Sequence, residues 1–169
     1  DYREMTCKVG QASTIRVLKN SYSVHSRLRG ENVVVRIYAE HLEVWYGQGQ
    51  IEQLPRLRGE NGHSINYRHV IDWLVRKPGA FEYYQYKNDL FPSSQFRMAY
   101  DLLREQQGVP SGNKQYLKLL ELAARQSETA VNEILRFFLS QGLLVMDVNS
   151  SLNSSISQGT MPALMKSPY

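Results

Sequence analysis

The side chains best suited to binding chemistry in this sequence are arginines and lysines that alternate with aromatic and glycine residues from Arg56 to Phe81. A guanidinium is planar and donates two parallel hydrogen bonds, so arginine suits phosphate groups. Tyrosines and tryptophans nearby would add flat apolar surface. The pattern predicts contact with a polyanion such as nucleic acid. The predicted phosphate contacts are Arg56, Arg58, Arg68, Arg76 and Lys77, together with Arg27, Arg29 and Arg36 from the preceding segment.

The charge distribution agrees with this prediction. Residues 1–77 contain 12 Lys/Arg and 8 Asp/Glu, whereas residues 78–169 contain 8 of each, so the first part carries the whole net charge of +4. Arg16 and Lys19 belong to the same wider basic set. If about 3–5 phosphates are neutralised, affinity for duplex DNA should fall with log salt at about −0.9 per contact. A net charge of +4 is modest, and an ordinary solvated surface is the alternative interpretation.

No catalytic, metal-binding or cofactor-binding residue is expected in this chain. His63 and His69 have no cysteine or carboxylate at the spacing of a zinc site. The serines and Cys7 lack a nucleophile motif, and no glycine pattern matches a phosphate-binding loop. A two-metal site would need clustered carboxylates. Nothing in the sequence brings together the candidates Asp72, Glu82, Asp89 and Asp101.

Apolar residues from Ser13 to Leu54 recur at every second position, which is typical of half-buried strands. Short turn signals separate the runs and would join antiparallel neighbours. Five strands at this spacing predict a small barrel or sandwich, assigned to residues 1–64. The alternating residues are Ile15, Val17, Val33, Val35, Ile37, Leu42, Val44 and Tyr46, and the turns lie at 19–21, 29–32, 39–41 and 47–49.

Helical spacing replaces this alternation after residue 65. A basic helix that Asn66 can cap should end at Pro78 and lead into an aromatic connector, so residues 65–92 form one predicted segment. Amphipathic patterns at roughly 93–107, 113–126 and 128–141 predict a helical bundle within a module of residues 93–146. The fold class is therefore α+β, a small antiparallel β-barrel followed by an α-helical bundle. Residues 147–169 are rich in Ser and Asn, which predicts a disordered tail.

A single cysteine, Cys7, excludes an internal disulfide and fits a reducing compartment. No stretch approaches the roughly 20 apolar residues that span a bilayer, so no membrane partner is expected. These features predict a cytoplasmic location. The sequence opens at Asp1 in strand-like residues, which suggests that it is a fragment of a longer protein.

Four segments between residues 13 and 107 carry a resemblance to a known family: Tyr22-Ser23-Val24, Leu42-Glu43-Val44-Trp45-Tyr46, Tyr67-Arg68-His69-Val70-Ile71-Asp72-Trp73-Leu74 and Arg76-Lys77-Pro78-Gly79-Ala80-Phe81. Residues 13–107 resemble the segment after the catalytic domain of IstA-type insertion-sequence transposases, relatives of phage Mu transposase in the DDE integrase superfamily. The resemblance implies a Src-homology-3-like barrel that contacts transposon-end and target DNA in a bacterial homo-oligomer. It also implies an upstream catalytic domain with three carboxylates and a divalent metal such as magnesium, and a possible AAA+ helper ATPase as partner.

Two features depart from that family pattern. Asn66 stands where aspartate is expected before the Tyr-Arg-His run, although asparagine is an equally competent helix cap. The sequence after Met146 matches no part of the pattern. The chain is therefore interpreted as a non-catalytic part of a transposase that binds DNA and supports synaptic-complex assembly. The alternatives are a protein–protein adaptor without DNA contact and, less favoured, a self-contained nuclease.

Overall fold

The computed structural model describes residues 1–142. The chain divides into two compact units, Asp1–Trp73 and Leu74–Tyr169, and the helix α1 (Tyr67–Arg76) runs across this division. The boundaries predicted after residues 64 and 92 stay predictions. The tail predicted at 147–169 lies outside the described residues, as does the end of the module predicted at 93–146.

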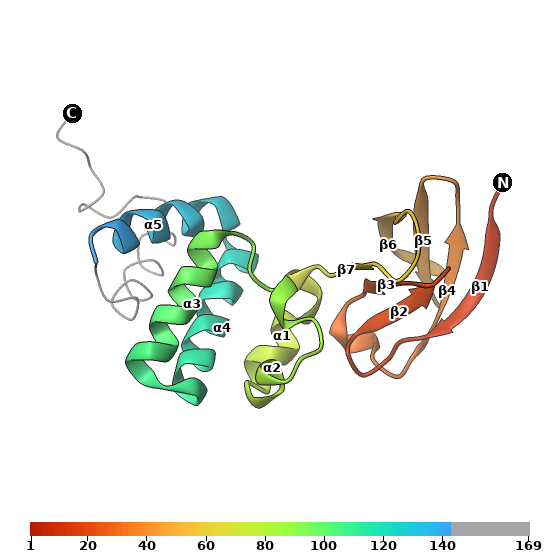
Figure 1. Ribbon diagram of the computed structural model, residues 1–169. Coiled ribbons are helices and arrows are strands. Elements are labelled where there is room, and N and C mark those ends of the chain that lie inside the picture. The colour runs from red at the N-terminus through yellow and green to blue at the C-terminus, as the bar shows by residue number, and fades with distance from the viewer. Residues whose placement is uncertain (143–169) are drawn as a thin grey trace. The chain divides into compact units, whose positions relative to one another are not determined.

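The first unit contains two hydrogen-bonded sheets (Figure 1). A four-stranded antiparallel sheet has the order β1-β4-β5-β6, and a three-stranded sheet has the order β2-β3-β7, in which β7 pairs with β3 in parallel. A short 3-10 helix, η1, follows β3. The elements are β1 (Arg3–Lys8), β2 (Thr14–Val17), β3 (Asn20–Ser23), η1 (Ser26–Leu28), β4 (Asn32–Ile37), β5 (His41–Tyr46), β6 (Gly49–Pro55) and β7 (His63–Ser64).

The expected α+β class and the five strands between residues 13 and 54 are confirmed, as β2 to β6. The expected closed barrel is not found. Among the described residues β1 and β6 are the edges of the larger sheet, and no ladder joins it to the smaller sheet. Alternation along a strand reports which face is buried but not which edge pairs with which. The Src-homology-3-like detail stays a prediction.

Most of the alternating residues identified in the sequence form the hydrophobic core of the first unit, together with Tyr22 and Val24. Tyr46, expected on the same face as Leu42 and Val44, is instead 42% exposed, because it lies at the end of β5 beyond a register shift at Val44/Trp45. The inward side chains of β4 and β5 are almost completely buried, and those of β2 and β3 join them from the smaller sheet. Burying an aliphatic side chain of this size contributes about 1.5–3 kcal/mol. This core therefore fixes both sheets. Its main members are Ile15, Val17, Tyr22, Val24, Val33, Val35, Ile37, Leu42 and Val44.

Helix α1 is tied to the sheets by the buried His69. The cap works as expected, because the Arg68 N–H donates to Asn66 Oδ1 at 3.0 Å. His69 Nδ1 lies 2.7 Å from Ser23 Oγ, and its Nε2 lies 3.1 Å from a carboxylate oxygen of Glu52. A carboxylate can only accept, so Nε2–H donates to Glu52 and Nδ1 accepts the Ser23 hydroxyl proton. The histidine thus connects β3, β6 and α1.

His69 makes the stability of the first unit depend on pH. Burial lowers the pKa of His69 below its usual 6.5, against the opposing effect of the Glu52 carboxylate. The unfolded chain then binds more protons, so the free energy of unfolding should fall as pH drops through about 6.5. Urea denaturation between about pH 7.5 and 5.5 measures this slope. A His69→Gln variant should show a flatter slope and the exposed His63→Gln control an unchanged one. An equal slope in His69→Gln and the wild type would contradict the assignment.

The second unit is a small helical bundle. Its elements are α2 (Gly79–Glu82), η2 (Lys87–Asp89), α3 (Ser94–Gln107), α4 (Val109–Arg125) and α5 (Glu128–Ser140). The three predicted helices are confirmed, except that α4 starts about one turn earlier than expected. Pro110 sits in its first turn, where its missing N–H has no cost. Helix α3 packs along α4, and α5 contacts both.

An aromatic cluster forms the centre of this bundle. The Tyr116 ring lies 5.9 Å from Phe81 and 5.2 Å from Tyr100, measured between centroids. Its hydroxyl donates to the Leu90 carbonyl at 2.7 Å. The aromatic connector predicted after residue 78 therefore supplies core side chains such as Phe81 and Leu90, and Tyr83 stays exposed.

Candidate nucleic-acid interface

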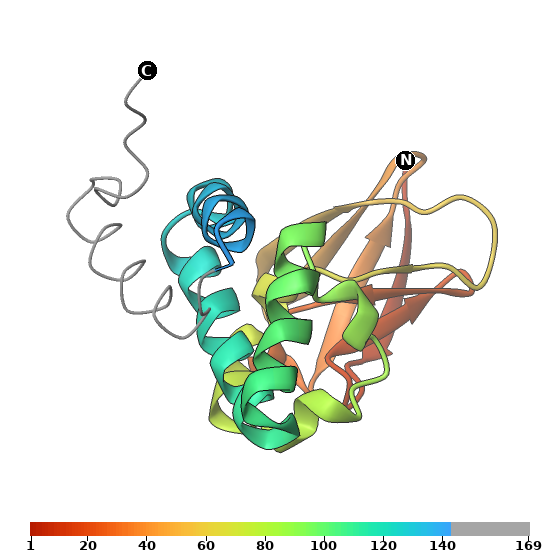
Figure 2. The ribbon, with the colours of Figure 1, turned by 60° about the vertical axis from the view of Figure 1, so that its left-hand side comes forward.

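The loop from Arg56 to Gly62 is held in a fixed shape by the buried Asn20. The Asn20 Nδ2 donates to the Gly59 carbonyl at 2.9 Å, and its Oδ1 accepts the Gly62 N–H at 2.7 Å. Two main-chain bonds add to this: Asn61 N–H to Lys19 O at 2.7 Å and Ser21 N–H to Gly62 O at 2.9 Å. The loop therefore lies along the β2–β3 hairpin (Figure 2).

The tip of that hairpin has an unusual backbone. Its two central residues, Leu18 and Lys19, have φ values of 49° and 66°. Positive φ at both central positions is the requirement of a type I′ turn, which usually selects Asn or Gly. A leucine and a lysine there are strained by the contact of Cβ with the backbone. The hydrogen-bonded pairing of β2 with β3 maintains this strained conformation. Leu18 lies at the tip of the hairpin and is 37% exposed.

Arg56 and Arg58 extend from the clamped loop. Arg56 Nη1 donates to the Tyr38 carbonyl at 2.9 Å. Arg58 Nη2 contacts both carboxylate oxygens of Glu40, at 2.8 and 2.9 Å. The Leu57 N–H between them donates to the Tyr22 hydroxyl at 2.8 Å, which fixes the main chain that carries both arginines.

Two more cations lie on the same surface. Arg16 Nη2 donates to Asn61 Oδ1 at 3.1 Å, and Lys19 Nζ lies 3.4 Å from Glu60. The ion pairs of Lys19 and Arg58 are largely solvent-exposed, so they are weak and compatible with exchange for phosphate oxygens. We call this surface the loop end; its cations are Arg16, Lys19, Arg56 and Arg58.

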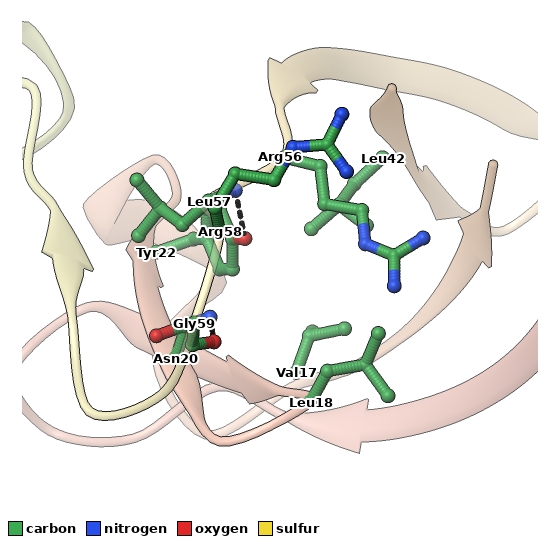
Figure 3. A pocket seen from close by; sticks show the side chains of 9 residues that line it. All are labelled: Val17, Leu18, Asn20, Tyr22, Leu42, Arg56, Leu57, Arg58 and Gly59. Carbon is green, nitrogen blue, oxygen red and sulfur yellow. Dashed lines mark hydrogen bonds between the residues drawn. The ribbon is translucent and has the colours of Figure 1, made fainter. Parts of the chain in front are cut away.

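A pocket of about 160 Å³ opens within the loop end (Figure 3). Val17 and Leu18 lie across the hollow from the segment that carries Arg56 and Arg58. The lining combines apolar side chains with guanidinium groups. It comprises Val17, Leu18, Asn20, Tyr22, Leu42, Arg56, Leu57, Arg58 and Gly59.

Arg27 and Arg29 lie elsewhere, on and just after η1. The Arg29 guanidinium lies 4.1 Å from the centroid of the Trp73 ring, and Arg27 is exposed. Arg29 is thus partly engaged in a cation–π contact. Neither residue belongs to the loop end.

Arg36 has a different environment from the other predicted residues. Its guanidinium lies between the rings of Tyr2 and Trp45, at 4.9 and 4.3 Å from their centroids. Its buried Nε has no hydrogen-bond partner among residues 1–142. Tyr38 stacks on His41 at 4.5 Å nearby. Tyr38 and Trp45 therefore pack on this face of the larger sheet.

The remaining predicted contacts lie on or next to α1. Arg68 is exposed near the start of the helix, with its guanidinium 4.6 Å from the Tyr67 ring centroid. Arg76 and Lys77 are exposed at its end and belong to the second unit. Of the eight predicted residues, the loop end unites Arg56 and Arg58, and phosphate contact by any of the eight stays a prediction.

Sequence reasoning missed Leu18 and Asn20 as parts of the site. A turn was predicted at 19–21, yet the tip is one residue earlier and Asn20 lies in β3 with its side chain buried. Within the described part of the chain, no three His, Cys, Asp or Glu residues form a possible metal site. No helix among those residues is long and apolar enough to cross a membrane.

Comparison with known proteins connects the first unit to transposition. Residues 2–66 match the family described as Mu transposase, C-terminal domain. The match supports a transposase C-terminal region. An uncharacterized protein of Sinorhizobium fredii, y4jA/y4nE/y4sE, is 35% identical over 127 aligned residues, in an alignment that covers 73% of this chain and 25% of that protein. The chain thus spans about a quarter of the length of this relative. No solved structure matches the chain.

Proposed function

We propose that the loop end binds the sugar-phosphate backbone of DNA within a transposase. The observation that carries this proposal is a set of four cations on a scaffold clamped by Asn20, inside the segment that matches a transposase C-terminal domain. Fixed cations neutralise phosphates with little loss of conformational entropy, and the counterions they release favour binding. Contacts of this kind position a protein on a duplex without reading its sequence.

The wider role follows from the same family relation. In this proposal the parent protein is an IstA-type member of the DDE superfamily, whose metal-dependent catalytic domain lies outside this chain and uses magnesium. The chain holds transposon ends and target DNA, and it supports assembly of a homo-oligomeric synaptic complex in the bacterial cytoplasm. The helical second unit offers the surface for assembly, including contact with an AAA+ helper ATPase.

Removal of two loop-end charges should weaken DNA binding strongly. In a Lys19→Gln/Arg58→Gln variant, two lost phosphate contacts at a slope of about −0.9 each predict about 60-fold weaker binding at about 0.1 M salt. The salt slope should decrease by about 1.8. Both side chains are exposed, so the fold should persist. Fluorescence anisotropy with a blunt duplex measures both quantities.

Lys8→Gln is the matched control, because Lys8 is an exposed cation at the end of β1 and is not one of the four loop-end cations. Binding by this variant should equal that of the wild type. If the wild type stays folded and does not bind duplex DNA at low salt, the adaptor interpretation replaces the proposal. If the double variant binds as tightly as the wild type, DNA contacts lie elsewhere on the chain.

A further inference from the structure

The face of the larger sheet that points away from the core carries a row of alternating charges; we call it the outer face. Residues directly opposite each other on antiparallel strands lie on the same face of a sheet. The register places Arg36 of β4 between Glu4 of β1 and Glu43 of β5. Gln53 of β6 follows Glu43. The row therefore runs negative, positive, negative and neutral across the four strands.

Arg36 is held in this row without a charged partner. Its guanidinium lies between the rings of Tyr2 and Trp45, and within the described residues no ion pair joins it to Glu4 or Glu43. Its buried Nε has no hydrogen-bond partner among residues 1–142. A buried donor without a partner costs free energy, and a guanidinium has five N–H donors. The two rings thus fix a cation that has donors available for an acceptor on another molecule.

The Glu43 carboxylate is oriented by its neighbours. Its Oε1 accepts a hydrogen bond from Trp45 Nε1–H at 3.2 Å, and its Oε2 lies 3.5 Å from His41 Nε2. The side chain is 17% exposed. An ionised carboxylate offers about four lone-pair sites, so Glu43 can also accept from an arginine.

The chemistry of the outer face suits a protein partner better than DNA. Tryptophan, tyrosine and arginine are the residues most enriched at the energetic centres of protein interfaces. Here Arg36 and Trp45 lie beside the stacked rings of Tyr38 and His41. The two glutamates that flank Arg36 in the row repel a polyanion and oppose the phosphate contact predicted from the sequence.

A second copy of this chain is the partner that matches the row. In a two-fold symmetric contact each pairing occurs twice. A two-fold axis parallel to the strands and midway between β4 and β5 places each β4 residue opposite its register partner on the other copy. Arg36 then faces Glu43 of the second copy. The same axis places β1 opposite β6, so Glu4 faces Gln53 and no like charges meet in the row.

We propose that two copies of this chain associate through their outer faces, with Arg36 of each copy bound to Glu43 of the other. The inference rests on the proposed function, which calls for a homo-oligomer, and it assigns part of the assembly to the first unit. Four strands of 6 or 7 residues present a face of roughly 400 Å², about half of what one partner buries in a standard interface. The association is accordingly weak, with a dissociation constant of about 10–100 µM.

Sedimentation velocity of the full 169-residue chain without DNA tests this association. The dimer fraction of the wild type should rise between about 5 and 500 µM. Arg36→Glu and Glu43→Arg each bring like charges together twice, so each variant alone should dimerise at least about 10-fold more weakly. An equimolar mixture of the two should recover the dimer, because one contact then has both charges exchanged and the other has neither.

Glu4→Arg is the matched control. It makes the same change of charge beside Arg36 within the chain, but it faces Gln53 of the second copy. It should dimerise like the wild type and should not rescue Arg36→Glu. Circular dichroism checks that each variant is folded. Dilution of the wild type, followed by amide chemical shifts, needs no variant; the concentration-dependent changes should fall on β4 and β5.

The possible outcomes separate this inference from the proposed function. A wild type that binds duplex DNA but stays monomeric throughout would overturn the dimer and leave the proposed function standing. A dimer that does not bind DNA would contradict the proposed function alone. A mixture of the two folded variants that stays monomeric would overturn the pairing of Arg36 with Glu43. Rescue of Arg36→Glu by Glu4→Arg would overturn the position of the two-fold axis.

Discussion

Replacement of Asn20 by alanine is expected to release the Arg56–Gly62 loop and to abolish tight DNA binding. The side chain is 2% exposed and supplies both a donor and an acceptor to the loop. Loss of both bonds, which leaves the Gly62 N–H and Gly59 carbonyl without these partners, should destabilise the first unit by about 2–3 kcal/mol. Affinity for DNA should fall further than the loss of one charge predicts, because Arg58 loses its fixed position. Urea denaturation and anisotropy measure the two effects.

Asn32→Ala is the matched control, since Asn32 is exposed at the start of β4. It should change neither stability nor affinity appreciably. An Asn20→Ala variant that is destabilised but binds DNA normally would show that the loop geometry is irrelevant to binding. A variant with wild-type stability would contradict the role of Asn20 as the clamp.

Replacement of Tyr116 by alanine should have the largest effect on the second unit. The ring is fully buried among Phe81, Phe91 and Tyr100, and the hydroxyl is bonded to the Leu90 carbonyl. Removal of a buried aromatic ring costs about 3–5 kcal/mol, which is much of the stability of a small domain. Loss of the helical circular dichroism signal at a lower urea concentration than in the wild type would report this destabilisation.

Tyr116→Phe separates the ring from the hydroxyl. This variant keeps the ring contacts and leaves the Leu90 carbonyl without its partner, so it should cost about 1–3 kcal/mol. Tyr83→Ala is a surface control, because the Tyr83 side chain is 90% exposed. An equal effect of Tyr116→Ala and Tyr83→Ala would contradict the aromatic cluster as the centre of the bundle.

Periodicity in the sequence was sufficient to place most elements of the fold. The alternation of Val33, Val35 and Ile37 marked the buried face of β4, and helical spacing located α3 and α5. Strand partners could not be derived this way, because they depend on hydrogen bonds between segments distant in sequence. The two-residue strand β7, parallel to β3, has no sequence signal of its own.

The loop end was only partly predictable for a related reason. Arg56 and Arg58 were recognisable as basic residues in a glycine-containing loop, but the clamp depends on Asn20, about 40 positions away in sequence. The turn at Leu18 and Lys19 lacks the asparagine and glycine that normally mark positive φ. Charge alone also gave no distinction between Arg58 at the loop end and Arg36, which lies between two aromatic rings.

The most direct test of the central claim is to map the DNA contact by NMR, with amide chemical shifts of the labelled chain followed during titration with a blunt duplex. The largest changes are expected at the hairpin tip and the clamped loop, at Leu18, Lys19 and Arg56–Gly59. They should weaken as salt is raised, because the contact is with phosphates. Changes confined to the helical unit, or no changes in a folded chain at low salt, would contradict the loop end as the DNA-binding surface.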